Sequence, residues 1–281
     1  MSGSQHYPQE QSSSAQSAPH FPQNFGVPGL PTHFWNPTTT AFKEIGKLYS
    51  RGAKYDQEDV VWHAWDAILR LYFPEVDDAN GVSWSIRREA YRGLPPVQSP
   101  SQTKPDVIAV RLMSLPRQPG QIPQGTGRDF LWVECKAANH DTPHGWKDLT
   151  SEAVIRLGHA HPDRPLSLIL AIGWKCMLFT WDPTDILQQA HVPNYILSRD
   201  RSQHWPVDVR IKSAHAFPWA NPISGAITPD NAFELDSWTL APPTAGLNVL
   251  YNGGNLGIIE HFLVTVRLMP YHLHGVNPAS F

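Results

Sequence analysis

The chain has 281 residues, 41% of them hydrophobic, and its 22 Lys and Arg against 25 Asp and Glu give a formal net charge of -3. This balance excludes a protein that coats itself with nucleic acid through bulk positive charge, but a localised basic groove remains open. With two cysteines, the chain is neither a disulfide scaffold nor a four-cysteine zinc protein, which fits a reducing compartment.

The N-terminal segment carries no secretory signal, and no apolar run approaches the ~20 residues of a membrane-spanning helix. We therefore expect an intracellular protein, in the nucleus or the cytoplasm, with no membrane partner. Residues 1–35 are dominated by Ser, Gln, Pro and His, a composition typical of a disordered tail. Phe21, Phe25, Phe34 and Trp35 are candidates for docking this tail onto the folded body.

Two helices are expected after the tail. Residues 40–50 place Ala41, Ile45 and Leu48 on one face of a helix. In residues 56–73 the apolar side chains recur at spacings of three and four, and acidic residues in the first turn interact favourably with the helix dipole.

Strands dominate the middle of the chain. The segments expected as strands are alternating, β-branched or continuously apolar, namely residues 82–91, 106–113, 130–138, 166–172 and 175–181. The second and third of them form a hairpin whose long tip is residues 116–128. An amphipathic helix at residues 146–159 follows the hairpin.

The order helix, three strands, helix, strand predicts an α/β sandwich with a central mixed β-sheet flanked by helices. We expect a single domain over residues 36–281, with its core at about 56–190 and a C-terminal extension over 191–281. Two more strands are expected in that extension, at residues 232–240 and 256–268.

One apolar strand contains two charged residues. Glu134 and Lys136 interrupt an otherwise apolar stretch, and burying both charges is costly unless something pairs them. Because side chains alternate along a strand, both point to one face, roughly 7 Å apart, while Cys135 points to the other. Two interpretations remain open: a metal or catalytic site, or a buried ion pair of Glu134 with Lys136 or with an arginine.

Asp106 opens the preceding strand, directly after Pro105. In an antiparallel hairpin it would lie beside Glu134, where the two carboxylates repel each other. A hard divalent cation such as Mg²⁺, held by one or two carboxylates and by water, relieves such repulsion. Lys136 beside the ion would orient a water molecule or stabilise charge on a phosphate.

Pro105-Asp106 followed by Glu134-Cys135-Lys136 resembles the motif of the PD-(D/E)XK, or restriction-endonuclease-like, nuclease superfamily. The αβββαβ order of the expected elements is similar to the core of that superfamily. The resemblance implies a metal-dependent nuclease that hydrolyses phosphodiester bonds in nucleic acid, with DNA expected as the substrate rather than RNA and with Mg²⁺ or Mn²⁺ as cofactor. It also implies a homodimer as one assembly, because members that cut both strands often dimerise.

Carried onto this chain, the resemblance makes Asp106, Glu134 and the backbone carbonyl of Cys135 ligands of the metal. It makes Lys136 the catalytic lysine, acting with Asp106 and Glu134. Some branches of the superfamily carry a Gln and a Tyr four residues apart on the helix after the lysine, and this chain has no such pair there. This departure argues against an exonuclease-like assignment but leaves the core motif intact.

Many members of the superfamily add an acidic ligand from the first core helix. Glu58 is the best match for it, with Asp59 and Asp66 as rivals. A charge that simply interacts with the helix N-terminus is an equally good interpretation of Glu58.

Contacts to phosphates need several basic side chains along one groove. The candidates around the motif are Arg88, Lys104, Lys147 and Arg156, each of which is also explained as a solvated surface charge. The alternative function is a catalytically inactive nuclease-fold protein that binds nucleic acid or a protein partner. Retention of the acidic residues together with the lysine speaks against it.

Overall fold

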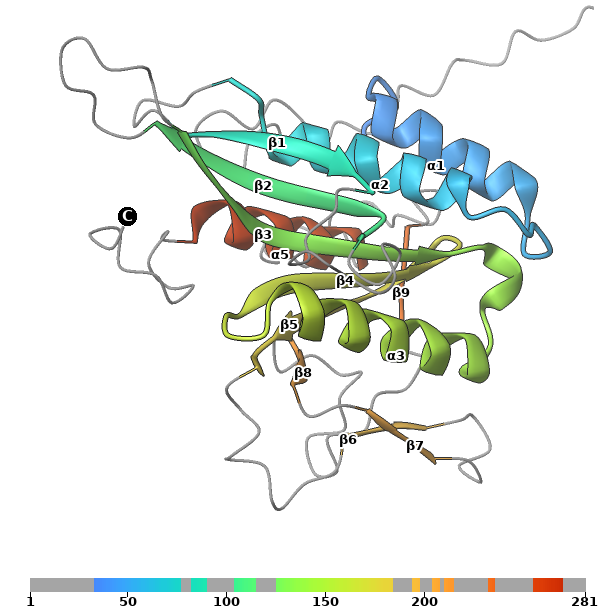
Figure 1. Cartoon of the computed structure of the whole chain (residues 1–281). Helices are drawn as coiled ribbons and strands as arrows, with labels where there is room; N and C mark the ends of the chain where they lie inside the picture. The colour runs from blue at the N-terminus through green and yellow to red at the C-terminus, as the bar shows by residue number, and fades with distance from the viewer. Residues whose placement is uncertain are drawn as a thin grey trace, which may run out of the picture.

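The computed structural model describes residues 33–76, 82–89, 104–114, 125–183, 194–197, 204–207, 210–214, 232–235 and 255–269. Within them, a mixed β-sheet lies between two layers of helices (Figure 1). This confirms the α/β class and the flanked mixed sheet that the order of elements predicted. In this part of the chain, no helix combines the length and the apolar character needed to cross a membrane.

The helical layer on one face begins with α1 (Thr40–Arg51) and α2 (Asp59–Tyr72). The side chain of Thr39 caps α1 by accepting a hydrogen bond from the Phe42 amide at 3.1 Å, which satisfies one of the free N–H groups of the first turn. Both helices were predicted, although α2 begins three residues later than expected.

The end of the predicted tail packs against this helical layer. Phe34 and Trp35 are buried, and the amide of Phe34 donates to the Tyr72 hydroxyl at 3.1 Å. The rest of the predicted tail, residues 1–32, lies outside the described residues.

The main sheet has seven strands, β1 (Val82–Arg88), β2 (Val107–Ser114), β3 (Gly125–Lys136), β4 (Leu166–Ile172), β5 (Lys175–Trp181), β8 (Ile211–Ser213) and β9 (Phe233–Glu234). The first six are neighbours in this order, and β9 pairs with β5. Only the pair β3–β4 is parallel among these described strands. The predicted hairpin is β2–β3, and the bounds predicted for β4 and β5 match the structure.

A helical crossover joins the two parallel strands, as parallel pairing requires. After β3 come a short 3-10 turn, η2 (Ala138–His140), and the helix α3 (Pro143–Ala160). Side chains of β3 alternate between two cores: Leu131, Val133 and Cys135 pack toward α1, α2 and α5, whereas Trp132 packs toward α3. Glu134 and Lys136 therefore face α3.

The turn between β4 and β5 supports the end of β3. The amide of Gly173 donates to the Lys136 carbonyl at 3.0 Å. Gly173 has φ +56°, and a Cβ there would lie 2.8 Å from the Cβ of Ala138. A glycine is required here by both the backbone conformation and the close approach, so this turn holds the strand end that carries Lys136.

The structure overturns the strand predicted at residues 256–268, which form a helix, α5 (Asn255–Leu268). Its buried apolar residues recur at helical spacing, namely Leu256, Ile259, Phe262, Leu263 and Val266. A run of 14 residues is also too long for a typical strand, so length and period both favour a helix. The strand predicted at 232–240 is described only as the two-residue β9, since residues 236–240 lie outside the described part.

The C-terminal region also contains a second, two-stranded sheet. It pairs β6 (Asn194–Leu197) with β7 (His204–Val207) in antiparallel fashion. Neither strand was expected from the sequence.

Candidate functional site

The candidate site lies where the start of β2 meets the end of β3. Antiparallel pairing places Val107 opposite Val133, so Asp106, just before β2, comes beside the end of β3. The Asp106 carboxylate accepts a hydrogen bond from the Cys135 amide at 2.6 Å. The structure thus brings Asp106 next to Glu134, as expected for a hairpin.

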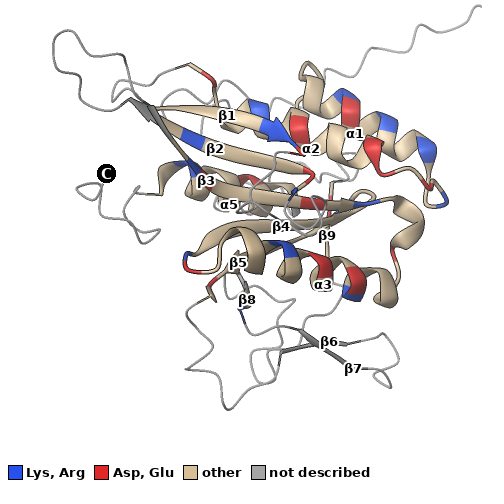
Figure 2. Cartoon of the chain, in the orientation of Figure 1, with Lys and Arg blue, Asp and Glu red and all other residues tan. Residues whose placement is uncertain are grey.

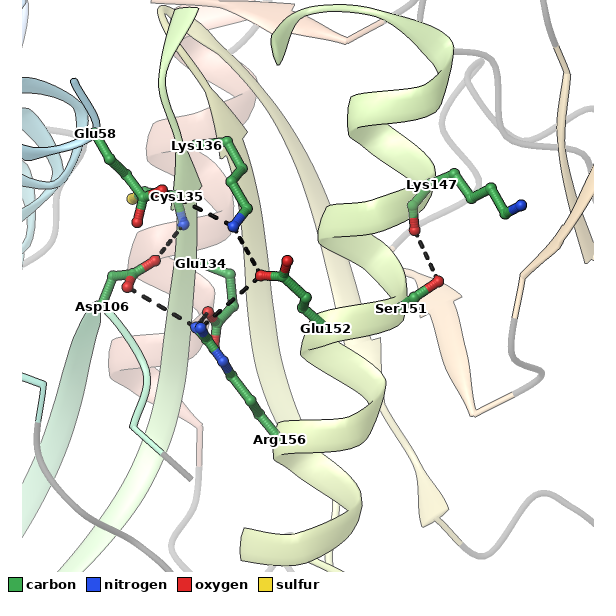
Figure 3. Close-up of polar contacts among 9 residues, drawn as sticks. All are labelled: Glu58, Asp106, Glu134, Cys135, Lys136, Lys147, Ser151, Glu152 and Arg156. Carbon is green, nitrogen blue, oxygen red and sulfur yellow. Dashed lines mark hydrogen bonds and ion pairs between the residues drawn. The ribbon is translucent and has the colours of Figure 1, made fainter. Parts of the chain in front are cut away.

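Glu134 lies on the face of β3 that α3 covers, and its side chain has no exposed surface. Its Oε2 atom accepts a hydrogen bond from the guanidinium of Arg156 on α3 (Figure 3). The ion pair with an arginine, one of the two interpretations of the motif, is therefore present. Among the described residues, however, the buried Oε1 atom of Glu134 has no hydrogen-bond partner.

Arg156 connects three carboxylates. Besides its hydrogen bond to Glu134, its Nη1 atom lies 3.9 Å from Asp106 Oδ1 and its Nη2 atom 3.9 Å from Glu152 Oε2. In Figure 3, dashed lines run from the guanidinium to the side chains of Asp106 and Glu152, and the Glu134 carboxylate is drawn beside it. Arg156, a candidate for phosphate contacts, balances the acidic residues of the site in this structure.

Lys136 reaches toward two other acidic residues. Its Nζ atom lies 2.8 Å from Glu152 Oε2 and 3.9 Å from Glu58 Oε2. Glu58 occupies the N-cap position of α2, yet its side chain makes no capping hydrogen bond. Its carboxylate is directed to the cluster instead, which favours Glu58 over Asp66, because Asp66 is paired with Arg70 at 2.9 Å.

Burial dominates the protonation of these acids. It raises the pKa of Glu134 well above its usual range, and the neighbouring Asp106 carboxylate adds to the rise while Arg156 opposes it. Burial also raises the pKa of Asp106, against the hydrogen bond from Cys135. For Glu58, burial and the charge of Asp106 raise the pKa to about 7.

For Lys136, burial acts in the opposite sense, but its pKa is also raised. Burial by itself would lower its pKa, but the hydrogen bond and negative charge of Glu152, together with the charge of Glu58, raise it above the usual value. Lys136 is therefore a protonated hydrogen-bond donor in this arrangement rather than a base.

The raised pKa of Glu58 predicts a pH-dependent stability. Since its folded pKa is about 7 against 4.5 for the free side chain, the protonated form contributes stability below about pH 4.5 that is lost as the pH rises through about 7. Replacing Glu58 with Gln removes this loss, so in EDTA the melting temperature of Glu58→Gln relative to wild type should rise between pH 5 and pH 8. Thermal unfolding across that range measures it.

The matched control is Asp59→Asn, which removes one carboxylate from the exposed first turn of the same helix. A difference between Glu58→Gln and wild type that stays constant with pH would contradict the assignment.

The other three basic candidates, Arg88, Lys104 and Lys147, differ in their position relative to the cluster. Arg88, at the end of β1, stacks over the ring of Trp62 at 4.5 Å, and the next residue's amide bonds to the Asp106 carbonyl at 3.3 Å. Lys104 lies two residues before Asp106 and is partly exposed. Lys147 is on α3, but its side chain points away from the cluster in Figure 3. Arg88 and Lys104 thus flank the site, and Lys147 does not join it.

Sequence reasoning did not identify Glu152, nor the part that Arg156 plays. The two are four residues apart on α3 and border the buried stripe of Leu149, Ala153 and Leu157. A sequence signal for such partners exists. Where a helix covers a strand that contains charged residues, charged residues at the border of the helix's apolar stripe are candidates to pair with them. Figure 2 shows acidic and basic residues interspersed on α1, α2 and α3.

The residues present fit a divalent cation by the chemistry of their donors. Within the described ranges, no three His, Cys, Asp or Glu side chains form a group able to hold an ion by themselves. Mg²⁺, however, commonly uses only one or two carboxylates, with water and substrate oxygens completing its coordination. Asp106 and Glu134 supply two carboxylates, and the unpartnered Glu134 Oε1 is a buried acceptor that a cation would satisfy.

Comparison of the chain with protein-family models, with curated proteins and with solved structures gives no significant match to any of them. The functional interpretation therefore depends on the arrangement of Asp106, Glu134, Lys136 and their neighbours in this chain.

Proposed function

We propose that this chain is a metal-dependent nuclease, with a restriction-endonuclease-like core, that hydrolyses phosphodiester bonds in nucleic acid, and we take DNA rather than RNA as its substrate. One observation carries the proposal: Asp106, Glu134 and Lys136 come together where β2 begins and β3 ends, with Glu134 fully buried. Burying a carboxylate beside a second one costs stability. Such an arrangement is typical of a site that is retained for its chemistry.

Asp106, Glu134 and the Cys135 carbonyl would hold Mg²⁺ or Mn²⁺, with Glu58 as a further acidic side chain. When bound, the ion would polarise the phosphate and lower the pKa of a water molecule. Lys136, kept protonated by Glu152 and Glu58, donates a hydrogen bond to a phosphate oxygen and stabilises the negative charge that develops there.

A second candidate function is binding of nucleic acid or a protein partner without cleavage. The observation that favours it is the hydrogen bond from Arg156 to Glu134, because a guanidinium can balance the negative charge of the carboxylates without a divalent metal ion.

Cleavage assays separate the two candidates. Single- and double-stranded DNA and RNA are incubated with the wild-type chain in Mn²⁺ or in EDTA, beside Lys136→Ala. The proposed nuclease cleaves in Mn²⁺ only, and loss of Lys136 lowers the rate by about 10²- to 10⁴-fold, in the range of a lost electrostatic or proton-transfer contact. Lys147→Ala removes the same charge from a side chain that points away and should cleave normally. Absence of cleavage on every substrate favours the binding function.

Arg88 gives a prediction that holds for the nuclease and for a chain that binds nucleic acid without cleaving it. A basic side chain that contacts a phosphate releases about one counterion, so Arg88→Ala should weaken binding at every sequence and lower the salt dependence of log Kd by about 1. Fluorescence anisotropy of a labelled oligonucleotide in EDTA, over a series of salt concentrations, measures both. An unchanged slope would place Arg88 outside the interface, and Lys147→Ala is the charge-matched control.

A further inference from the structure

The guanidinium of Arg156 occupies the space between the two carboxylates of the proposed metal site. It donates to Glu134, and its Nη1 atom is 3.9 Å from Asp106 Oδ1. These are the two side chains that would hold a cation, so Arg156 and a divalent ion would draw on the same pair of carboxylates.

The pairing with Arg156 is incomplete for Glu134. One carboxylate oxygen accepts from the guanidinium, while the other is buried and lacks a partner in the described part of the chain. A divalent cation carries twice the charge of a guanidinium and binds carboxylate oxygens directly. Asp106 and Glu134 can therefore bind more positive charge than Arg156 alone supplies.

A third carboxylate, which also pairs with Lys136, lies near Arg156 on its own helix. Glu152 lies one turn earlier on α3, with its Oε2 atom 3.9 Å from Arg156 Nη2. The side chain of Glu152 is 40% exposed, against 0% for Glu134. A guanidinium leaving Glu134 would thus keep an ionic partner and move toward solvent.

We propose that Arg156 is a positioning residue that competes with the divalent ion for Asp106 and Glu134 and is released toward Glu152 when the ion binds. The inference rests on the proposed metal site, and it adds that Arg156 sets the ion concentration at which that site fills. In the ion-free chain, Arg156 neutralises the buried carboxylates and keeps them in place.

Mn²⁺ affinity without nucleic acid tests this directly. Free Mn²⁺ is measured by electron paramagnetic resonance during titration of wild type, Arg156→Gln and Lys147→Gln. Removal of the competitor should tighten Mn²⁺ binding by about tenfold or more, as expected for loss of a charge-assisted hydrogen bond from the ion-free state. Lys147→Gln, with the same charge change on the same helix, should bind like wild type. An Arg156→Gln affinity equal to or weaker than wild type overturns the proposal.

Two further variants keep the result interpretable. Arg156→Lys retains a positive charge but lacks the planar fork of donors, so its Mn²⁺ affinity should fall between those of wild type and Arg156→Gln. If Arg156→Gln does not fold, a folded Arg156→Lys that binds no tighter than wild type overturns the proposal. Asp106→Asn should abolish binding.

The outcomes distinguish this inference from the proposed function. Mn²⁺ binding to wild type that is lost in Asp106→Asn but unchanged in Arg156→Gln overturns the competition and leaves the metal site standing. Binding by Arg156→Gln with none by wild type supports the competition and favours the non-cleaving function of the natural chain. No binding by any variant overturns both.

Discussion

Replacing Arg156 with Gln is expected to lower the free energy of unfolding by about 3 kcal/mol in the presence of EDTA. The side chain of Glu134 is fully buried and accepts its hydrogen bond from Arg156, which is itself 20% exposed. Without the guanidinium, the buried Glu134 either stays charged beside Asp106 with no cation to balance it or takes up a proton. Urea unfolding followed by circular dichroism measures the loss.

A double-mutant cycle isolates the pair from other effects of the substitution. Glu134→Gln alone should cost only about 1 kcal/mol, because Arg156 keeps Asp106 and Glu152 within 3.9 Å. The double variant should be more stable than Arg156→Gln by about 1.5 kcal/mol, since no unpaired buried charge is left. If the stability losses of the two single variants add up to the loss of the double variant, the two residues do not interact. Lys147→Gln should remain within about 0.5 kcal/mol of wild type.

The predicted fold was most accurate where a short local pattern decides the structure. The continuous apolar run of β4 and the two-residue break before β5 set the bounds of both strands. The strand predicted at α5 is wrong although the sequence carries the opposite signal, because the length of this segment and the period of its apolar residues both indicate a helix. The local pattern does not reveal that this helix packs against α2 and β9.

The candidate site was predictable in part for a similar reason. Glu134 and Lys136 are two residues apart on one strand, so strand periodicity alone places them on one face, and hairpin pairing brings Asp106 to them. Glu152 and Arg156 reach the site only because the α3 crossover lies over β3. That depends on how the helix is rotated about its axis, which tertiary packing sets. The sequence therefore predicts that Asp106, Glu134 and Lys136 lie together, but it does not identify Arg156 as the partner of Glu134.

A second buried polar cluster, remote in sequence from the site residues, gives the other large expected effect. Glu260 on α5 lies 2.9 Å from His33 Nδ1 and accepts a hydrogen bond from the Tyr72 hydroxyl on α2. All three side chains are buried, and His33 also stacks on Trp35 with ring centroids 4.6 Å apart. The cluster thus ties α5, α2 and the segment before α1 together.

Replacing Glu260 with Ala is expected to lower the free energy of unfolding by about 3 kcal/mol. The Tyr72 hydroxyl then loses the acceptor for its proton inside the core, and His33 loses this partner. Because α5 is held to α2 through this residue, hydrogen exchange of the α5 amides should accelerate more than that of the β3 and β4 amides. Urea unfolding gives the global loss, and exchange followed by mass spectrometry gives its distribution.

Two variants on the same helix define the source of this effect. Glu260→Gln keeps an acceptor oxygen and should cost about half as much as Glu260→Ala. Thr265→Ala removes a hydroxyl that donates to the His261 carbonyl of α5 itself at 2.8 Å, so it should leave the contact with α2 intact. A Glu260→Ala variant within about 0.5 kcal/mol of wild type, with α5 exchanging as before, would show that apolar packing alone holds α5. The expected ranking, with Ala well below Gln, follows because it is the loss of the buried acceptor, rather than the loss of charge, that destabilises the cluster.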